Sequence, residues 1–556
     1  MNQKAFENLS ISEVQFLPII KEYARKIQLV ETIDRLVDTQ MHISPGIIVL
    51  AMVLDTLSGR SPLYRLADFF EEKDTELLIG TAIQPEQFTD HTIGRALDKI
   101  HQTGTQRIFS QLSQNAIGNF QINTDGAHFD TTSITVYGNY EMEEAPLKIT
   151  HGYSKDNRPD LKQFLVEMLC VDRDIPILGR TRDGNASDKT LNNELLGSIS
   201  SYMAAHGLSD EAFVYVADSA FVTGENLKCA GSDIKFLSRL PATYKECSRV
   251  IQDAVNQDGW INIGVLAETD TTEKRPAAEY KAYDSSVIIE EMEYRAIVVH
   301  SSVYDKRRQA RIDRQIKASR EDLQKACGEI IAPSYFCEAD AVAALAKLEH
   351  LPKKTDYFRV KASVNKVPIY KRGRPRQGCE RTPERYEYRI ETQIVEDDTK
   401  TRDLRYEAGC FVLLTNLISD VEKRKWPPEK LLGLYKDQSG IERNFGFLKD
   451  PVIINSVFLK KPERIEVLGM ILVISLLIWR LLERSMREYL AKKDTTITGW
   501  VRRRTKKPTS FMMTTKFISI LVIKHGGQWF LSKPMKPVQL EYLEALGVLP
   551  EAFVTP

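Results

Sequence analysis

Paired cysteines, long apolar runs and an excess of one charge are all missing from this sequence. Its seven cysteines form no C-x-x-C pair and no zinc-type cluster, so neither a disulfide scaffold nor a structural zinc site is expected. The longest uncharged apolar stretch, Val467 to Trp479, has 13 residues, fewer than the roughly 20 of a membrane span. It predicts a buried helix rather than a membrane anchor.

Net charge and the first residues narrow the class further. The 76 Lys+Arg balance 76 Asp+Glu, which excludes a protein coated in positive charge. No apolar core flanked by positive charge follows Met1, so no export signal is expected and we predict a cytoplasmic protein. A length of 556 residues is enough for three or four domains.

The N-terminal segment, residues 1–120, shows helical periodicity with short breaks. Ser44-Pro45 and Thr89 are typical helix starts, and the apolar run Ile47 to Leu57 follows the first of them. We predict an all-α domain here. It is either a DNA-end-binding module of the helix-turn-helix type or a helical packing and oligomerisation module, and periodicity alone leaves both open.

Strand patterns begin near residue 121. They cover residues 127–131, 133–138, 164–171, 212–217 and 234–240, with a helical pattern at 189–205. Three strands, a helix, a strand, a short helical piece and a further strand predict a mixed sheet flanked by helices. This order suits the first part, residues 121–241, of an RNase H-like catalytic core.

A β-rich insertion is predicted from residue 242 to 427. Tyr386 to Ile394 alternates with period two, as does Met292 to Val298, and Cys410 to Thr415 is an apolar strand. A charged helix at 306–325 separates them. The helical pattern of residues 428–492 predicts the final helices of the core, and residues 493–556 a helical C-terminal region. The predicted fold is therefore a multidomain α/β protein.

One short segment combines several polar groups at helical spacing. In Tyr435-x2-Gln438-x3-Glu442-x6-Lys449, 100° per residue places all four side chains on one narrow face of a helix. Such a stripe has the length to follow several phosphates of a duplex. Gly440 opposes a continuous helix, and a solvated helix face is the alternative interpretation.

Two aspartates lie on predicted strands. Asp130 closes the stretch that begins at Ala127, and Asp218 closes the apolar run from Phe213 to Ala217. A carboxylate at the end of a buried strand is costly unless it binds a cation or is well hydrogen-bonded. Asp130, Asp218 and Glu442 are hard oxygen ligands for two Mg²⁺ (or Mn²⁺) ions, whereas Asp125 fits a turn. A turn former or helix cap is the simpler interpretation of either aspartate alone.

Together these residues resemble a known family. The set Asp130, Asp218 and Glu442, with Tyr435, Gln438 and Lys449 at the spacing above, is similar to the DDE transposases of bacterial insertion sequences, in the group with a Tyr-x2-Arg-x3-Glu-x6-Lys signature and a β-rich insertion. The segments Gly152 to Gln163 and Asp218 to Phe221 also look like sequence motifs of that family. Gln438 departs from the usual arginine and removes one charge directed at phosphate.

The resemblance implies roles for the matching residues. Asp130, Asp218 and Glu442 would be the catalytic metal ligands, and Tyr435 and Lys449 would contact DNA near the cleaved phosphate. The implied activity is transposition by two-metal-ion strand cleavage and strand transfer, on terminal inverted repeats and target DNA, by a homodimer in the synaptic complex and near the bacterial nucleoid. A metal-dependent nuclease without strand transfer and a catalytically silent, transposase-derived DNA-binding protein are the alternatives.

Further DNA contacts are predicted outside this set. From Arg359 to Arg376 there are seven basic residues and no acidic one. Lys371, Arg372, Arg374 and Arg376 surround a Gly and a Pro in a stretch similar to an AT-hook, which lies in the minor groove, although a flexible basic loop is the alternative. Trp426 is placed either to stack on an unpaired base or to pack as a hydrophobic staple.

Overall fold

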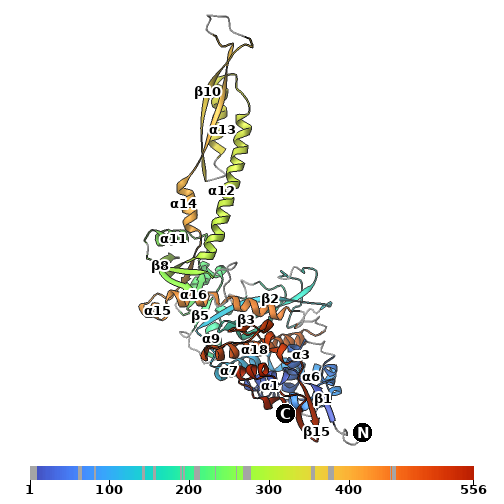
Figure 1. Ribbon diagram of the computed structural model, residues 1–556. Coiled ribbons are helices and arrows are strands. Elements are labelled where there is room, and N and C mark those ends of the chain that lie inside the picture. The colour runs from blue at the N-terminus through green and yellow to red at the C-terminus, as the bar shows by residue number, and fades with distance from the viewer. Residues whose placement is uncertain are drawn as a thin grey trace. The chain divides into compact units, whose positions relative to one another are not determined.

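The computed structural model describes residues 9–59, 65–80, 83–140, 145–154, 158–187, 191, 194–205, 213–231, 233–257, 259–266, 277–351, 357–373, 381–450, 453 and 459–556 (Figure 1). The chain forms two compact units. Unit 1 comprises Met1–Ala217, Glu225–Leu237 and Leu434–Pro556, and unit 2 comprises Asp218–Gly224 and Ser238–Gly433. Both combine helices with strands of a mixed sheet, so the multidomain α/β prediction is confirmed.

The N-terminal part of unit 1 is mainly helical. Its helices are α1 (Leu17–Lys26), α2 (Leu29–Leu36), α3 (Pro45–Leu57), α4 (Leu66–Glu71), α5 (Thr75–Ile79), α6 (Asp90–Thr103) and α7 (Thr105–Phe120). The Ser44 hydroxyl accepts the N–H of Ile47 to begin α3, and Thr89 accepts that of Thr92 to begin α6. Both predicted helix starts are confirmed.

A small sheet joins the two ends of unit 1. Strand β1 (Leu9–Glu13) pairs antiparallel with β15 (Leu521–His525), which pairs with β16 (Gln528–Leu531). The prediction of an all-α N-terminal segment is wrong at β1, because the hydrogen-bonding partner of this five-residue strand lies some 500 residues away in the chain. The C-terminal region, residues 493–556, was predicted to be helical and is only partly helical. It holds β13 (Ile497–Thr498), β14 (Arg504–Thr505), α19 (Ser510–Phe517) and α20 (Pro537–Leu546) besides β15 and β16.

The main strands of unit 1 lie in the order β4-β3-β2-β5-β6. Their bounds are β2 (Gly126–Val136), β3 (Lys162–Val171), β4 (Ile175–Arg182), β5 (Val214–Val216) and β6 (Phe236–Arg239). Neighbours from β4 to β2 pair antiparallel, whereas β5 is parallel to both β2 and β6. The two strands predicted at 127–131 and 133–138 form the single strand β2, since no turn interrupts them, and β4 was not predicted. Part of the helical pattern at 189–205 forms α9 (Ile199–Ala205), and α10 (Gly224–Ala230) lies between β5 and β6.

Helix α18 (Pro462–Lys492) is the central helix of unit 1. It packs on β4 and on α3, α6, α7 and α20. Gly179 of β4 allows the close approach, because a Cβ there would lie 2.7 Å from Val473. An 18-residue window of α18 is long and apolar enough for a membrane span, but 94% of it is buried within the protein. This burial is typical of a core helix and agrees with the helix predicted from Val467 to Trp479.

The further strands, which belong to unit 2, lie in the order β12-β9-β8-β7. Their bounds are β7 (Ile261–Val265), β8 (Glu279–Ile289), β9 (Met292–Ser301) and β12 (Cys410–Thr415). Helices α11 (Lys245–Gln257) and α14 (Asp398–Glu407) pack on each other and on this sheet. Short helix α15 (Asp420–Lys425) and then α16 (Pro428–Lys436) follow β12. The strands predicted at Met292–Val298 and Cys410–Thr415 are confirmed.

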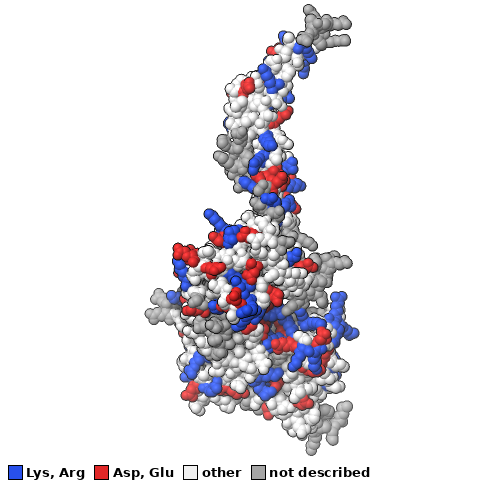
Figure 2. All heavy atoms as spheres, turned by 90° about the vertical axis from the view of Figure 1, so that its left-hand side faces the viewer, with Lys and Arg blue, Asp and Glu red and all other residues white. Residues whose placement is uncertain are grey.

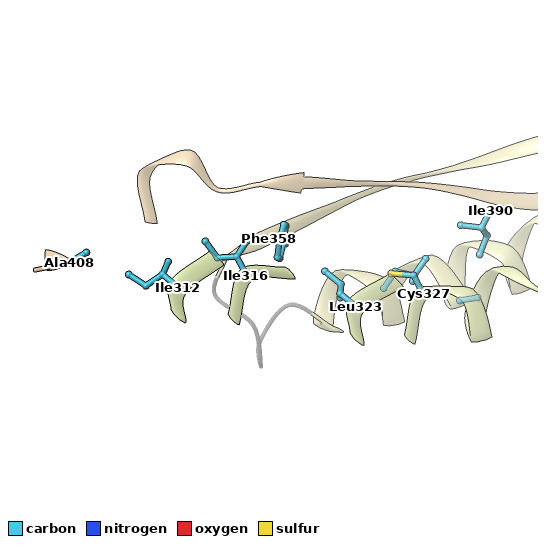
Figure 3. Close-up of a cluster of buried hydrophobic side chains, with 9 residues drawn as sticks. Ile312, Ile316, Leu323, Cys327, Phe358, Ile390 and Ala408 are labelled. Atoms are coloured by element: carbon cyan, nitrogen blue, oxygen red, sulfur yellow. The ribbon is translucent and has the colours of Figure 1, made fainter. Parts of the chain in front are cut away.

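Unit 2 also carries an arm with a hydrophobic core of its own. Long helix α12 (Ser302–Ile331) and α13 (Glu338–His350) lie alongside the hairpin of β10 (Phe358–Ile369) and β11 (Arg385–Glu396) (Figure 1). Ile316, Leu323, Phe358 and Ile390 are among the buried residues between them (Figure 3). The period-two strand predicted at 386–394 is confirmed as part of β11.

Candidate functional site

Asp130 lies inside strand β2 and is half-buried. Its Oδ1 accepts the N–H of Thr131 at 2.7 Å. The antiparallel register places it opposite Met168 of β3, so both side chains share one face of the sheet. The hydrogen bond from the Thr131 N–H orients the Asp130 carboxylate, which the sequence analysis predicts to be a metal ligand.

Asp218 follows β5 by two residues and is exposed. Its backbone is still extended, with φ −72° and ψ 175°, and its Oδ1 accepts the N–H of Ala220 at 3.1 Å. The hydroxyl of Ser238 donates to its carbonyl oxygen at 2.7 Å. Asp218 therefore lies just beyond the end of the buried strand β5, and it caps the 3-10 helix Ser219–Phe221, as the simpler interpretation expects. Asp125, the rejected competitor, lies in a bend just before β2.

The segment from Tyr435 to Lys449 is not one helix, so the predicted continuous stripe is wrong. Tyr435 belongs to α16, Gln438 is the N-cap of α17 (Ser439–Leu448), and Lys449 is its C-cap. Glu442 lies in the first turn of α17, where the helix dipole favours a carboxylate. Only Glu442 of the four projects from within α17.

Gly440 explains how α17 is positioned. A Cβ at this residue would lie 2.1 Å from the carbonyl oxygen of Arg173, in the turn between β3 and β4. The glycine that weakens helix propensity therefore lets the first turn of α17 sit directly on backbone. Arg173 also pairs with Asp437, whose carboxylate lies 3.3 Å from its Nε.

A buried polar network, which the sequence did not predict, anchors α17 to the sheet and to α18. The Asn444 amide donates to the carbonyl of Asp174 at 2.8 Å and to Sγ of Cys170 at 3.3 Å, and its oxygen accepts from Arg480 at 2.7 Å. Arg480 also pairs with Glu483 at 2.7 Å. The sequence did contain a sign of this network, because the opposite charges of Arg480 and Glu483 follow the apolar run of α18 at a spacing of three residues.

Two of the three predicted metal ligands lie on elements that pack against each other. Helix α17 packs on β2, so Glu442 and Asp130 lie on neighbouring elements of unit 1. Asn444 points into the sheet, whereas Glu442 lies on the exposed side of α17. No three His, Cys, Asp or Glu side chains within the described ranges form a group that could hold a metal ion. The convergence of Asp130, Asp218 and Glu442 stays a prediction.

Burial shifts the pKa of several groups near these residues. It lowers the pKa of His128, two residues before Asp130, to about 4. It raises the pKa of the Cys170 thiol and of the Asp437 carboxyl, the latter helped by the charges of Asp174 and Asp172. His128 is thus neutral at pH 7, and neither of its ring nitrogens has a hydrogen-bond partner within the described structure.

The basic stretch lies on and after β10, and acids that flank β11 partly neutralise it. Arg359 pairs with Asp397 at 2.9 Å, and the Lys371 ammonium lies 3.9 Å from Glu384. Figure 2 shows lysine, arginine and acidic side chains interspersed along the arm. Lys371 and Arg372 are exposed. Arg374 and Arg376 lie outside the described residues, as does the second half of the stretch similar to an AT-hook.

Trp426 is packed inside the protein. Its side chain is 3% exposed, and the Lys430 ammonium lies 4.0 Å from its ring centroid. Its carbonyl accepts a hydrogen bond from buried Arg295 at 2.8 Å. This burial favours the packing interpretation over stacking on an unpaired base.

Part of the chain matches a known family model. Residues 9–114 match a family model described as a domain of unknown function, DUF4277. The matched segment contains β1 and α1 to α6 and ends within α7. No curated protein matches the chain.

Proposed function

We propose that this protein is a DDE transposase that moves an insertion sequence by metal-dependent cleavage and transfer of DNA strands. The domain matched at residues 9–114 is commonly found in transposase-like proteins, which supports this class. The strand order β4-β3-β2-β5-β6 supports it as well. Three antiparallel strands followed by two parallel ones, with helices between the latter, suit the RNase H-like core that the family resemblance implies.

The register of two strands carries the proposal. His128 of β2 pairs with Val216 of the parallel strand β5, an offset of 88 residues. Asp130 and Asp218 are separated by the same 88 residues, and Asp218 keeps an extended backbone. If this register continues for two residues, the two carboxylates lie side by side at the end of the pair. An unrelated pair of aspartates would share this offset only by chance.

The donor set fits divalent cations of the magnesium type. Asp130, Asp218 and Glu442 offer only carboxylate oxygens, which Mg²⁺ and Mn²⁺ prefer. One oxygen of Asp130 and one of Asp218 accept backbone N–H groups, so neither carboxylate rotates freely. When bound, a pair of such ions supplies activation of the attacking oxygen and stabilisation of the leaving oxygen.

The remaining residues would bind and orient DNA. Tyr435, at the end of α16, and Lys449, at the end of α17, stand on either side of Glu442 in the chain and could contact phosphates. Gln438 can donate hydrogen bonds to a phosphate but adds no charge. We propose Lys371, Arg372, Arg374 and Arg376 as nonspecific backbone contacts and omit Trp426. The DNA partners are the terminal inverted repeats and the target, bridged by a homodimer.

Three single substitutions test the metal site. With purified protein, Mg²⁺ or Mn²⁺ and labelled terminal repeats, we expect Asp130→Asn, Asp218→Asn and Glu442→Gln each to lower strand cleavage by at least roughly a hundred-fold, because each removes one negative ligand. Asp125→Asn is the matched control and should cleave normally. Normal cleavage by any one of the three would remove that residue from the site.

Sequencing the reaction products separates the proposal from a nuclease. Joined donor and target ends are expected from a transposase. Cleaved ends without joints, under conditions that supply target DNA, would identify a metal-dependent nuclease instead.

A further inference from the structure

Unit 2 contains a cavity of about 260 Å³ on the face of its sheet that α11 and α14 cover. Val255, Ala408 and Cys410 give it an apolar wall. The other lining residues are Trp260, Lys281, His300 and Arg405. All of these lie in the part of unit 2 formed by the sheet and these helices, which Figure 1 labels at α11, α14 and β8.

Strand register explains why the polar residues gather there. Lys281 of β8 is paired with His300 of β9, and His300 is paired with Cys410 of β12. Directly opposed residues of antiparallel strands point to the same face, so the three side chains form one row across the sheet. The sequence alone could not indicate this row, because its members are separated by loops and by the whole arm.

The Trp260 indole is held at the rim of this row by two other rings. Its centroid lies 6.2 Å from that of His300 and 6.3 Å from that of Tyr283. Gly259 permits the approach, since a Cβ there would lie 2.9 Å from the ring of Tyr283. The indole is half-buried, so part of it remains accessible.

The cavity carries positive charge. No carboxylate is among its described lining residues, whereas Lys281 and Arg405 both are. Arg405 also pairs with Asp313 at 2.9 Å, on α12. Lys281 is exposed, and no described carboxylate pairs with its ammonium. An anion would therefore meet one unneutralised lysine, a second cation and the imidazole of His300.

We propose that this cavity binds a single nucleotide unit, with its phosphate at Lys281 and Arg405 and its base against Trp260. Proteins that bind single-stranded nucleic acids or nucleotides combine a cationic side chain, which contacts the phosphate, with an accessible aromatic ring, on which the base stacks. The volume is below the roughly 300–1,000 Å³ of drug-sized sites, so one ring system with its phosphate fits and a duplex does not. The nucleotide is either free or part of an unpaired strand. The inference goes beyond the proposed function and does not depend on it.

Binding by the full chain tests this inference. Fluorescence anisotropy of a labelled single-stranded pentadeoxyadenylate is measured without divalent cations, with dAMP and deoxyadenosine as competitors. We expect Lys281→Ala and Trp260→Leu each to weaken binding of the probe, or competition by dAMP, by roughly ten-fold. Trp260→Phe should retain most of the affinity, because a stacking face remains. The control, Lys317→Ala, removes an exposed lysine elsewhere in unit 2 and should bind normally.

The outcomes separate the sources of the ligand and the two proposals. Competition by dAMP but not by deoxyadenosine supports a free nucleotide, and loss of oligonucleotide binding alone supports a strand unit. Folded Lys281→Ala and Trp260→Leu proteins, verified by thermal melting, that bind both ligands as the parent does would overturn the inference. Because no metal or terminal repeat is present, this result would leave the transposase proposal standing, and failed cleavage would not affect the nucleotide site.

Discussion

The side chain of His128 makes the free energy of unfolding depend on pH. Its imidazole is buried on β2 without hydrogen-bond partners in the described structure, and its pKa is about 4, against an ordinary value of 6.5. Between these two values the unfolded chain binds a proton that the folded chain does not. The stabilising contribution is therefore complete above pH 6.5 and is lost as the pH falls towards 4.

We expect the free energy of unfolding to drop by roughly 3 kcal/mol from this residue between pH 7 and pH 4. Urea denaturation at a series of pH values measures it. In His128→Leu the drop in the free energy of unfolding between pH 7 and pH 4 should be smaller by that amount, because the titrating group is gone. An unchanged drop in this variant would show that His128 binds a proton in the folded protein as readily as in the unfolded chain.

Gly440 and Gly446 make a matched pair on one helix. A Cβ at Gly440 would lie 2.1 Å from the backbone carbonyl of Arg173, whereas at Gly446 nothing lies within 4 Å. We expect Gly440→Ala to destabilise unit 1 by about 1–3 kcal/mol, since backbone must move. Gly446→Ala should be neutral or stabilising by up to about 1 kcal/mol through helix propensity. Thermal melting of both variants checks the contrast, and equal melting temperatures would contradict it.

At the scale of elements, α17 and α18 are joined by buried charge. Arg480 is 7% exposed and binds both Asn444 and Glu483, while the N–H of Ser510 donates to Glu483 at 3.1 Å. Breaking a buried pair leaves an uncompensated charge, which typically costs about 3–5 kcal/mol. We expect Arg480→Leu to lower stability by an amount near the lower end, because Arg487 remains 3.5 Å from Glu483.

Chemical denaturation of Arg480→Leu measures that loss. The exposed Arg25, paired only with Glu22 on its own helix in the described structure, provides the control, and Arg25→Ala should leave the denaturation midpoint nearly unchanged. A midpoint for Arg480→Leu equal to that of the parent would show that the network contributes no net stability.

Elements were predictable where a local pattern sufficed. In strand β11, apolar and polar residues alternate along the strand, and α3 begins at the typical pair Ser44-Pro45. Both elements could therefore be predicted from the sequence. Strand β4 ends in the polar run Arg180 to Arg182, whose exposure depends on the neighbouring elements, and it was missed. The break between α16 and α17 was missed, and Asp437 at this break pairs with Arg173, which is far away in the chain. For the candidate site, the sequence supplied the acids and their strand contexts, whereas the supporting network needed tertiary contacts.

On the scale of the whole molecule, the arm of unit 2 has a core separate from the sheet it extends from. Phe358 is 3% exposed and belongs to this buried cluster, in which it lies beside Ile316 (Figure 3). We expect Phe358→Ala to cost about 3–5 kcal/mol of local stability. Hydrogen exchange should quicken in α12, α13, β10 and β11 and stay unchanged in α18 of unit 1. Faster exchange throughout α18 would show that the arm and unit 1 unfold together.

The two ends of unit 1 depend on each other through β1 and β15. Five residues from Leu9 to Glu13 pair with Leu521–His525, and the carbonyl of Ile520 accepts the N–H groups of Val14 and Gln15. The segment that matches DUF4277 therefore includes a strand whose partner lies outside it. Without β1, strand β15 would keep only β16 as a neighbour, and a two-stranded hairpin is marginal in water.

We expect removal of residues 1–13 to expose the amides of β15 to exchange with solvent and to lower the stability of unit 1. Hydrogen exchange monitored on a peptide covering 521–525 measures the first effect, and thermal melting the second. Removal of residues 1–8 alone keeps β1 and should preserve the protection of that peptide. If the longer truncation leaves the protection of β15 intact, the hairpin is stable by itself, and the N-terminal segment would then be independent of the C-terminus.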